Sequence, residues 1–90
     1  SGKQFIPLLT TIEARTMADF PSLVRHVGEE FFYVLSGQVT LHTEHYAPTV
    51  LEAGDSCYFD STMGHACVSS GDEPARILWI CSRVVAPLTA

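Results

Sequence analysis

The spacing of glycine and proline constrains this chain more than any other feature of its sequence. These residues occur at positions 2, 7, 21, 28, 37, 48, 54, 64, 71, 74 and 87, and most segments between them are five to ten residues long. Segments of this length are typical of β-strands, whereas helices need longer uninterrupted runs. The sequence therefore predicts a protein built from many short strands.

The segments between these breaks are rich in residues that favour strands. Val39, Leu41 and Thr43 alternate with polar neighbours, which indicates a strand with one buried face. The segment from Leu8 to Phe20 is long enough for a helix, but its threonines and Ile12 favour strand and loop instead. The predicted strands include Phe31–Leu35, Gln38–Thr43, Cys57–Phe59 and Ile77–Ile80.

Two turn sequences connect these predicted strands. Ser36-Gly37 predicts a tight hairpin turn, and Glu52-Ala53-Gly54-Asp55 predicts a second turn. Without a helix to make a parallel crossover, the strands are expected to pair antiparallel in a sandwich or barrel.

Ninety residues, 47% of them hydrophobic, are expected to form a single domain over residues 1–90. The start at Ser1-Gly2, without Met, suggests a tag remnant on a fragment of a longer chain.

Charge and composition exclude several classes of function. The net charge is −5, so direct DNA binding is not expected from this chain. No apolar stretch is long enough for a membrane span. Cys57, Cys67 and Cys81 lack a CxxC spacing, which favours buried thiols in a reducing cytoplasm. No nucleophile elbow or phosphate loop occurs. The five basic residues are scattered singly: Lys3, Arg15, Arg25, Arg76 and Arg83.

Histidines and carboxylates are the polar groups that could form a site. A turn at Val27-Gly28-Glu29 would bring the side chains of His26 and Glu30 together across a hairpin, as a metal pair requires. Taken alone, however, a solvated polar hairpin tip explains this pair better. His65 is by itself more typical of a structural histidine. A solvated strand face likewise explains the group formed by His42, Glu44 and His45.

Two stretches resemble the motifs of the cupin family. HVGEEFFYVLSG resembles the first motif, with His26, Glu30 and Gly37 on its second His, its Glu and its closing Gly. GDSCYFDSTMGH resembles the second motif, with Gly54 and His65 on its Gly and His. The strings RHVGEEFFYVLSGQVTLHTE, GDSCYFDSTMGHA and ARILW are most similar to the C-terminal domain of bacterial regulators with an Xre-type helix-turn-helix. The resemblance implies an all-β, antiparallel jelly-roll barrel.

The chain departs from the cupin pattern at four positions. Val24 stands at the first His of the first motif, Asp60 and Thr62 at the Pro and Gly of the second, and Ser69 at its Asn. The usual four metal ligands are thus reduced to three. Because Val24 offers no donor atom, we expect partial or absent metal occupancy.

The resemblance implies that His26, Glu30 and His65 would bind one divalent transition metal, Zn, Ni or Fe, with open coordination positions. The same three residues and Phe32 are expected to contact a ligand, and no catalytic residue is assigned. The expected function is sensing of a small polar effector for a regulator whose DNA-binding domain lies outside this chain, so we expect no enzyme activity. The alternatives are a small metal-dependent oxygenase or isomerase and a purely structural dimerisation module.

Two expectations concern packing and assembly. We expect a homodimer, because regulators of this class bind paired half-sites, with the apolar run from Phe5 to Leu9 as a cross-subunit strand. If Glu30 points inward, the period of two places Phe32 and Val34 inward as well. The inner face of the barrel is expected to comprise Phe32, Val34, Val39, Leu41, Phe59, Leu78 and Ile80.

Overall fold

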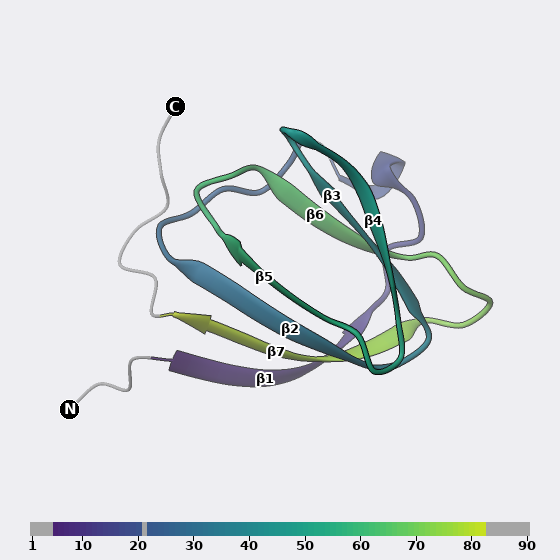
Figure 1. The fold of residues 1–90 in the computed structure, drawn as a ribbon. Helices are drawn as coiled ribbons and strands as arrows, with labels where there is room; N and C mark the ends of the chain where they lie inside the picture. Colours follow the sequence, from purple (N-terminus) through teal and green to yellow (C-terminus); the bar gives the residue numbers. More distant parts are fainter. Residues whose placement is uncertain (1–4, 21, 83–90) are drawn as a thin grey trace.

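The computed structural model describes residues 5–20 and 22–82 of the chain. Strands dominate this part, and the only helical element described is one turn of 3-10 helix, so the predicted all-β class is confirmed. The elements are β1 (Phe5–Ile12), η1 (Met17–Asp19), β2 (Glu29–Ser36), β3 (Gln38–Thr43), β4 (Tyr46–Glu52), β5 (Ser56–Asp60), β6 (His65–Ser69) and β7 (Ala75–Ser82) (Figure 1).

The strands form two antiparallel sheets, as expected of a jelly roll. One sheet has the strand order β1-β7-β2-β5, and the other has the order β4-β3-β6. In Figure 1, β1, β7 and β2 run along the lower side of the molecule, and β3, β4 and β6 lie along its upper side. Strands β2 and β3 join the two sheets through a tight turn at Gly37, which has a φ of 82°. Both predicted turns are present, since β4 and β5 are joined by the turn that contains Gly54. The turn at Ser36-Gly37 does not form the predicted hairpin, however, because β2 and β3 lie in different sheets and do not pair with each other.

The hydrophobic core lies between the two sheets. Strand β2 shows the alternation that the sequence predicts, because Glu30, Phe32 and Val34 are buried while their neighbours are more exposed. Strand β3 contributes Val39 and Leu41 in the same way. The buried cluster comprises Ile12, Phe32, Val34, Val39, Leu41, Leu51, Phe59, Ala75 and Ile77.

The prediction that Leu78 and Ile80 face the core is wrong. Val34 is paired with Ile77, and Phe32 is paired with Trp79, so the odd-numbered residues of β7 share the inner face of β2. Leu78 and Ile80 are partly exposed on the outer face. The run of apolar residues in β7 carries no alternation from which its inward face could have been predicted.

The predicted hairpin between His26 and Glu30 is also not formed. The chain bends at Val27 and Gly28, where Gly28 has a φ of 121°, and then enters β2 at Glu29. The segment that contains His26 pairs with the connection between β5 and β6, which is remote in sequence. Long-range pairing, not a local hairpin, therefore positions His26.

Strand β1 lies at one edge of the four-stranded sheet. It pairs along its whole length with β7 of the same chain, which leaves its other edge for a second copy. The cross-subunit role of this strand stays a prediction. No helix among the described residues has the length and apolarity to cross a membrane.

Gly37 and Gly54 offer a matched test of the turn geometry. Both have positive φ, so an alanine at either position costs about 1–2 kcal/mol of backbone strain. A Cβ on Gly37 would also lie 2.8 Å from the Cα of Ala75, whereas nothing lies within 4 Å of a Cβ on Gly54. We expect Gly37→Ala to reduce the unfolding free energy by about 1–3 kcal/mol more than Gly54→Ala, because it adds overpacking. Urea unfolding measures both losses, and equal losses would contradict the proposed close approach.

Candidate metal centre

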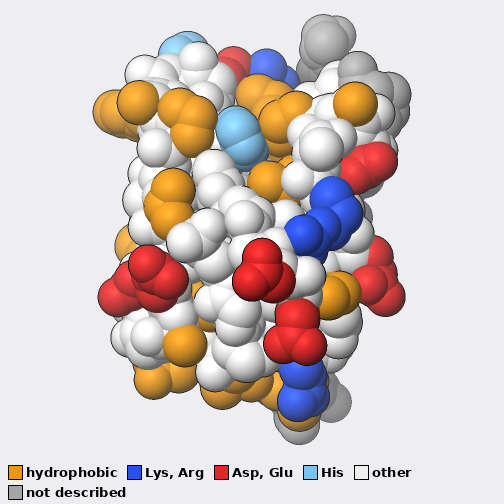
Figure 2. All heavy atoms as spheres, turned by 90° about the vertical axis from the view of Figure 1, so that its right-hand side faces the viewer, with side chains coloured by type: hydrophobic (Ala, Val, Ile, Leu, Met, Phe, Trp, Pro, Cys, Tyr) orange, Lys and Arg blue, Asp and Glu red, His pale blue; other side chains and the backbone are white. Residues whose placement is uncertain are grey.

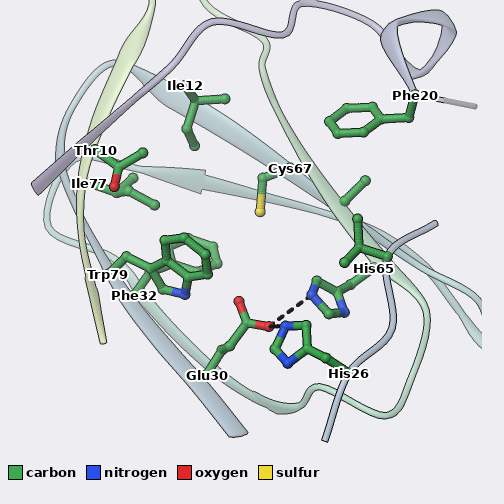
Figure 3. A pocket seen from close by; sticks show the side chains of 12 residues that line it. Thr10, Ile12, Phe20, His26, Glu30, Phe32, His65, Cys67, Ile77 and Trp79 are labelled. Atoms are coloured by element: carbon green, nitrogen blue, oxygen red, sulfur yellow. Dashed lines mark ion pairs between the residues drawn. The ribbon is translucent and has the colours of Figure 1, made fainter. Parts of the chain in front are cut away.

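Three side chains from two distant parts of the chain, residues 26–30 and residue 65, meet at one point inside the barrel. His26 comes from the segment before β2, Glu30 from β2, and His65 from the start of β6. The Nε2 atoms of His26 and His65 each lie 2.8 Å from Oε2 of Glu30 (Figure 3). One potential ligand atom from each of the three residues lies within 4.8 Å of the others. The structure thus brings together the three residues that the cupin resemblance singled out.

Backbone hydrogen bonds hold the two histidine segments side by side. The N–H of Val24 donates to the carbonyl of His65 at 2.9 Å, and the N–H of His65 donates back at 3.0 Å. The N–H of His26 donates to the carbonyl of Ser61, and the N–H of Ser61 donates to the carbonyl of Gly28. This short ladder sets the distance between the two imidazoles, whose ring centroids are 5.4 Å apart.

An ion pair on the outside reinforces this ladder. Arg25 pairs with Glu44, and the same carboxylate accepts a hydrogen bond of 2.7 Å from the N–H of Gly64. These two hydrogen bonds lower the pKa of Glu44 to about 2. A Cβ on Gly64 would lie 3.0 Å from the guanidinium carbon of Arg25, so a glycine permits this approach. The ion pair therefore joins the residues directly before His26 and His65.

Ser61 is a site residue that the sequence reasoning missed. Its side chain is fully buried, and its hydroxyl donates a hydrogen bond of 2.7 Å to Oε2 of Glu30. Ser61 lies within the stretch that resembles the second motif, but the resemblance assigns no role to it. Its partnership with Glu30 follows from the pairing of β2 with β5, which aligns Glu30 with Phe59.

The protonation of the cluster follows from its hydrogen bonds. Nδ1 of His65 lies 2.8 Å from the carbonyl of Met63, which can only accept, so this nitrogen carries a proton and Nε2 points to Glu30. Burial lowers the pKa of His65, but the hydrogen bonds to Glu30 and Met63 outweigh it and raise the pKa above its ordinary value. Burial raises the pKa of Glu30, but the hydrogen bonds from His65 and Ser61 bring it below its ordinary value.

A cavity of about 300 Å³ adjoins the three side chains. Phe32 lines this cavity, as the sequence reasoning expected of a ligand contact. Val24 also lines it, so the position of the missing fourth ligand presents an apolar group to the cavity. The full lining consists of Thr10, Ile12, Phe20, Val24, His26, Glu30, Phe32, His65, Ala66, Cys67, Ile77 and Trp79 (Figure 3).

The other candidate groups do not join this cluster. His45 is exposed and lies 3.7 Å from Glu44, whose carboxylate is already bound by Arg25 and Gly64. His42 belongs to β3 and pairs with Ala66 across the small sheet. Neither His42 nor His45 belongs to a group of three potential ligands among the described residues. Their interpretation as a solvated strand face agrees with the exposure of His45.

The donor set fits a transition metal ion. Two imidazoles and one carboxylate on one side of a site leave coordination positions open on the other, where the cavity lies. The bond from Nδ1 of His65 to a backbone carbonyl is the usual support of a metal-binding imidazole. Burial and the charge of Glu30 raise the pKa of Cys67 to about 12, so this thiol in the cavity lining stays protonated at neutral pH.

Comparisons with known proteins agree with this architecture. Residues 11–81 match the family model of the cupin domain. No curated protein matches the chain. A cupin-2 domain containing protein from Shewanella frigidimarina superposes with a TM-score of 0.71 at 18% identity, over 92% of this chain and 74% of that one.

Two further structures are of enzymes. Iron(II) HppE in complex with substrate superposes with a TM-score of 0.72 at 20% identity, over 89% of this chain and 46% of that chain. Hydroxypropylphosphonic acid epoxidase from S. wedmorenis in complex with fosfomycin superposes with a TM-score of 0.72 at 19% identity, over 89% of this chain and 44% of that chain. The chain thus spans less than half the length of these structures, and the likeness concerns the fold.

These structures correct one expectation from the sequence. The expectation that this chain is not an enzyme is wrong, because structures with the same fold include HppE, an iron-containing enzyme with its substrate. The reduced number of ligands had favoured sensing over catalysis. Yet three donors with open positions are a set that catalytic iron sites use.

The hydrogen bonds of the cluster predict how stability depends on pH. The raised pKa of His65 means that its contribution is present below the ordinary value of 6.5 and is lost as the pH rises through the raised value. The lowered pKa of Glu30 means that its contribution is lost as the pH falls below 4.5 toward the folded value. We expect His65→Gln to remove the alkaline loss of stability, measured by urea unfolding with a chelator present.

The exposed His45 provides the control for this experiment. His45→Gln makes the same chemical change outside the cluster, so its profile should match that of the wild type. If the wild type and His65→Gln lose stability in parallel above pH 6.5, the proposed pairing of His65 with Glu30 is contradicted.

Proposed function

The chain belongs to the cupin family, and we propose that it is a metal-dependent domain that acts on a small molecule bound in its cavity. His26, Glu30 and His65 would hold one divalent transition metal ion. The observation that carries this proposal is the convergence of their ligand atoms within 4.8 Å at the wall of the cavity. Iron, nickel and zinc all accept such a donor set.

The residues of the chain have separate tasks in this proposal. Such an ion, when bound, supplies Lewis-acid or redox chemistry at its open coordination positions. Ser61 orients the carboxylate of Glu30 through its hydroxyl, and the carbonyl of Met63 orients the ring of His65. The apolar walls exclude water and hold the ligand beside the donor atoms.

A second candidate function uses the same cavity for regulation. The strings around both motifs resemble the sensor domain of Xre-type regulators, which would act in the cytoplasm and bind DNA through a helix-turn-helix outside this chain. The distribution of charge supports binding of DNA by another domain, because the basic residues are scattered along the sequence. The arginine side chains that are coloured in Figure 2 lie apart from one another, with acidic side chains beside them. In this case we propose a homodimer, because paired operator half-sites call for two-fold symmetry.

The outer face of the four-stranded sheet supports such a dimer. Apolar side chains continue from strand to strand across it, with no charged residue in the row, and such patches mark contact surfaces. Light scattering would measure the dimer mass. The residues that follow one another across the four strands are Pro7, Ile80, Phe31 and Tyr58.

Metal titration tests the proposed function. We expect the wild-type protein to bind one Zn²⁺, Ni²⁺ or Fe²⁺ ion per chain, measured anaerobically by calorimetry and by elemental analysis. Glu30→Gln and His65→Ala should each lower the affinity more than about 100-fold, because they remove a ligand and not merely its support. His45→Ala should bind like the wild type, since His45 lies outside the cluster.

The same titration can contradict the proposal. Loss of no more than a few-fold in affinity on His65→Ala would place the ion elsewhere, and a wild type that binds no ion would reject the site. Consumption of a bound ligand by the iron-loaded protein favours the enzyme. Altered operator binding by the full regulator, without consumption of the ligand, favours the sensor.

A further inference from the structure

We propose that the cavity selects a small hydroxy acid with a single negative charge and an apolar, aromatic body. This inference rests on the metal site proposed above and names the class of molecule that the site takes. It differs from the small polar effector expected from the sequence, because the polarity of the ligand is confined to one end.

The distribution of polar groups over the cavity carries the first step. The two imidazoles and the carboxylate of the cluster lie together on one side of it (Figure 3). Elsewhere the lining is apolar except for the hydroxyl of Thr10, the thiol of Cys67 and the indole N–H of Trp79. A ligand that buries polar groups against the apolar walls would lose their hydrogen bonds with water. The matching ligand therefore has one polar head and an apolar body.

The charges around the cavity set the charge of the head. No lysine or arginine among residues 5–20 and 22–82 lines it, and Arg25 is engaged by Glu44. A divalent ion beside the carboxylate of Glu30 leaves one net positive charge, which a single negative charge on the ligand neutralises. A doubly charged phosphonate would bring an uncompensated charge into an apolar cavity, which is costly. A carboxylate with an adjacent hydroxyl meets this condition and offers two donor atoms to the open positions.

The volume and the walls define the body. A cavity of about 300 Å³ has room for about ten groups of the size of a water molecule, which corresponds to a carboxylate head and one ring. Phe20 lies across the cavity from Phe32 and Trp79 (Figure 3). These rings offer faces and edges to an aromatic body between them. Phe20 does not belong to the buried core cluster, so it can be changed without removing a core residue.

Three probes with related heads test this inference on the zinc-loaded protein. Glycolate has the head alone, 3-phenyllactate adds an aromatic body, and 2-hydroxypropylphosphonate replaces the carboxylate by a phosphonate. We expect calorimetry to show that phenyllactate binds at least about tenfold more tightly than glycolate, because a buried aromatic side chain gains this much. The phosphonate should bind no more tightly than glycolate.

Two matched variants test whether the cavity wall causes the preference for phenyllactate over glycolate. Phe20→Ala should weaken the binding of phenyllactate about fivefold or more, with glycolate binding unchanged. Phe5→Ala makes the same change on an exposed residue of β1 and should affect neither probe. Thermal unfolding of each zinc-loaded variant shows that it remains folded.

The outcomes separate this inference from the proposed function. A wild type that binds zinc but does not prefer phenyllactate to glycolate, or prefers the phosphonate, overturns the ligand class and leaves the metal site. Equal loss of phenyllactate binding in both alanine variants overturns the role of Phe20. A wild type that binds no zinc overturns the metal site and the ligand class together.

Discussion

A single carboxylate oxygen organises the functional part of this structure. Oε2 of Glu30 lies within hydrogen-bond distance of the hydroxyl of Ser61 and of the Nε2 atoms of His26 and His65. Burying a carboxylate costs free energy unless the carboxylate is paired and hydrogen-bonded, so these contacts offset the desolvation cost of Glu30. These contacts also bring together two segments that are remote in sequence, residues 26–30 and residues 61–65. The cavity, the proposed metal site and the irregular segment before β2 all depend on this convergence.

The rest of the fold makes that convergence rigid. Strand β2 lies between β7 and β5, and the inward alternation that buries Glu30 continues into the core through Phe32 and Val34. The segment of His26 contains no regular strand, so it relies on the backbone ladder to residues 61–65 and on the ion pair of Arg25 with Glu44. An exposed ion pair contributes little to stability. Here the ion pair matters because it helps to position two of the three donors: Glu44 binds both Arg25, next to His26, and Gly64, next to His65.

The sequence predicted what is local and missed what depends on distant pairing. Alternation identified the buried face of β3, the assumption that Glu30 points inward identified that of β2, and glycines marked the turns at Gly37 and Gly54. The apolar run of β7 has no alternation, so its inward face became known only from its pairing with β2. Motif spacing singled out the three donors, but Ser61 and Glu44 serve the site through contacts across the barrel. The hairpin assigned to Gly28 was wrong for the same reason, because the segment that pairs with His26 and Gly28 contains Ser61 and lies more than thirty residues away.

We propose that the two histidines and the carboxylate of Glu30 form one metal-binding unit. The most direct measurement is X-ray absorption spectroscopy on the protein loaded with one equivalent of Zn²⁺, compared with the His65→Ala variant. We expect two imidazole nitrogens and oxygen ligands at about 2.0–2.2 Å around the ion, with one imidazole lost in the variant. Sulfur ligands near 2.3 Å, or the same two imidazoles in both proteins, would contradict it.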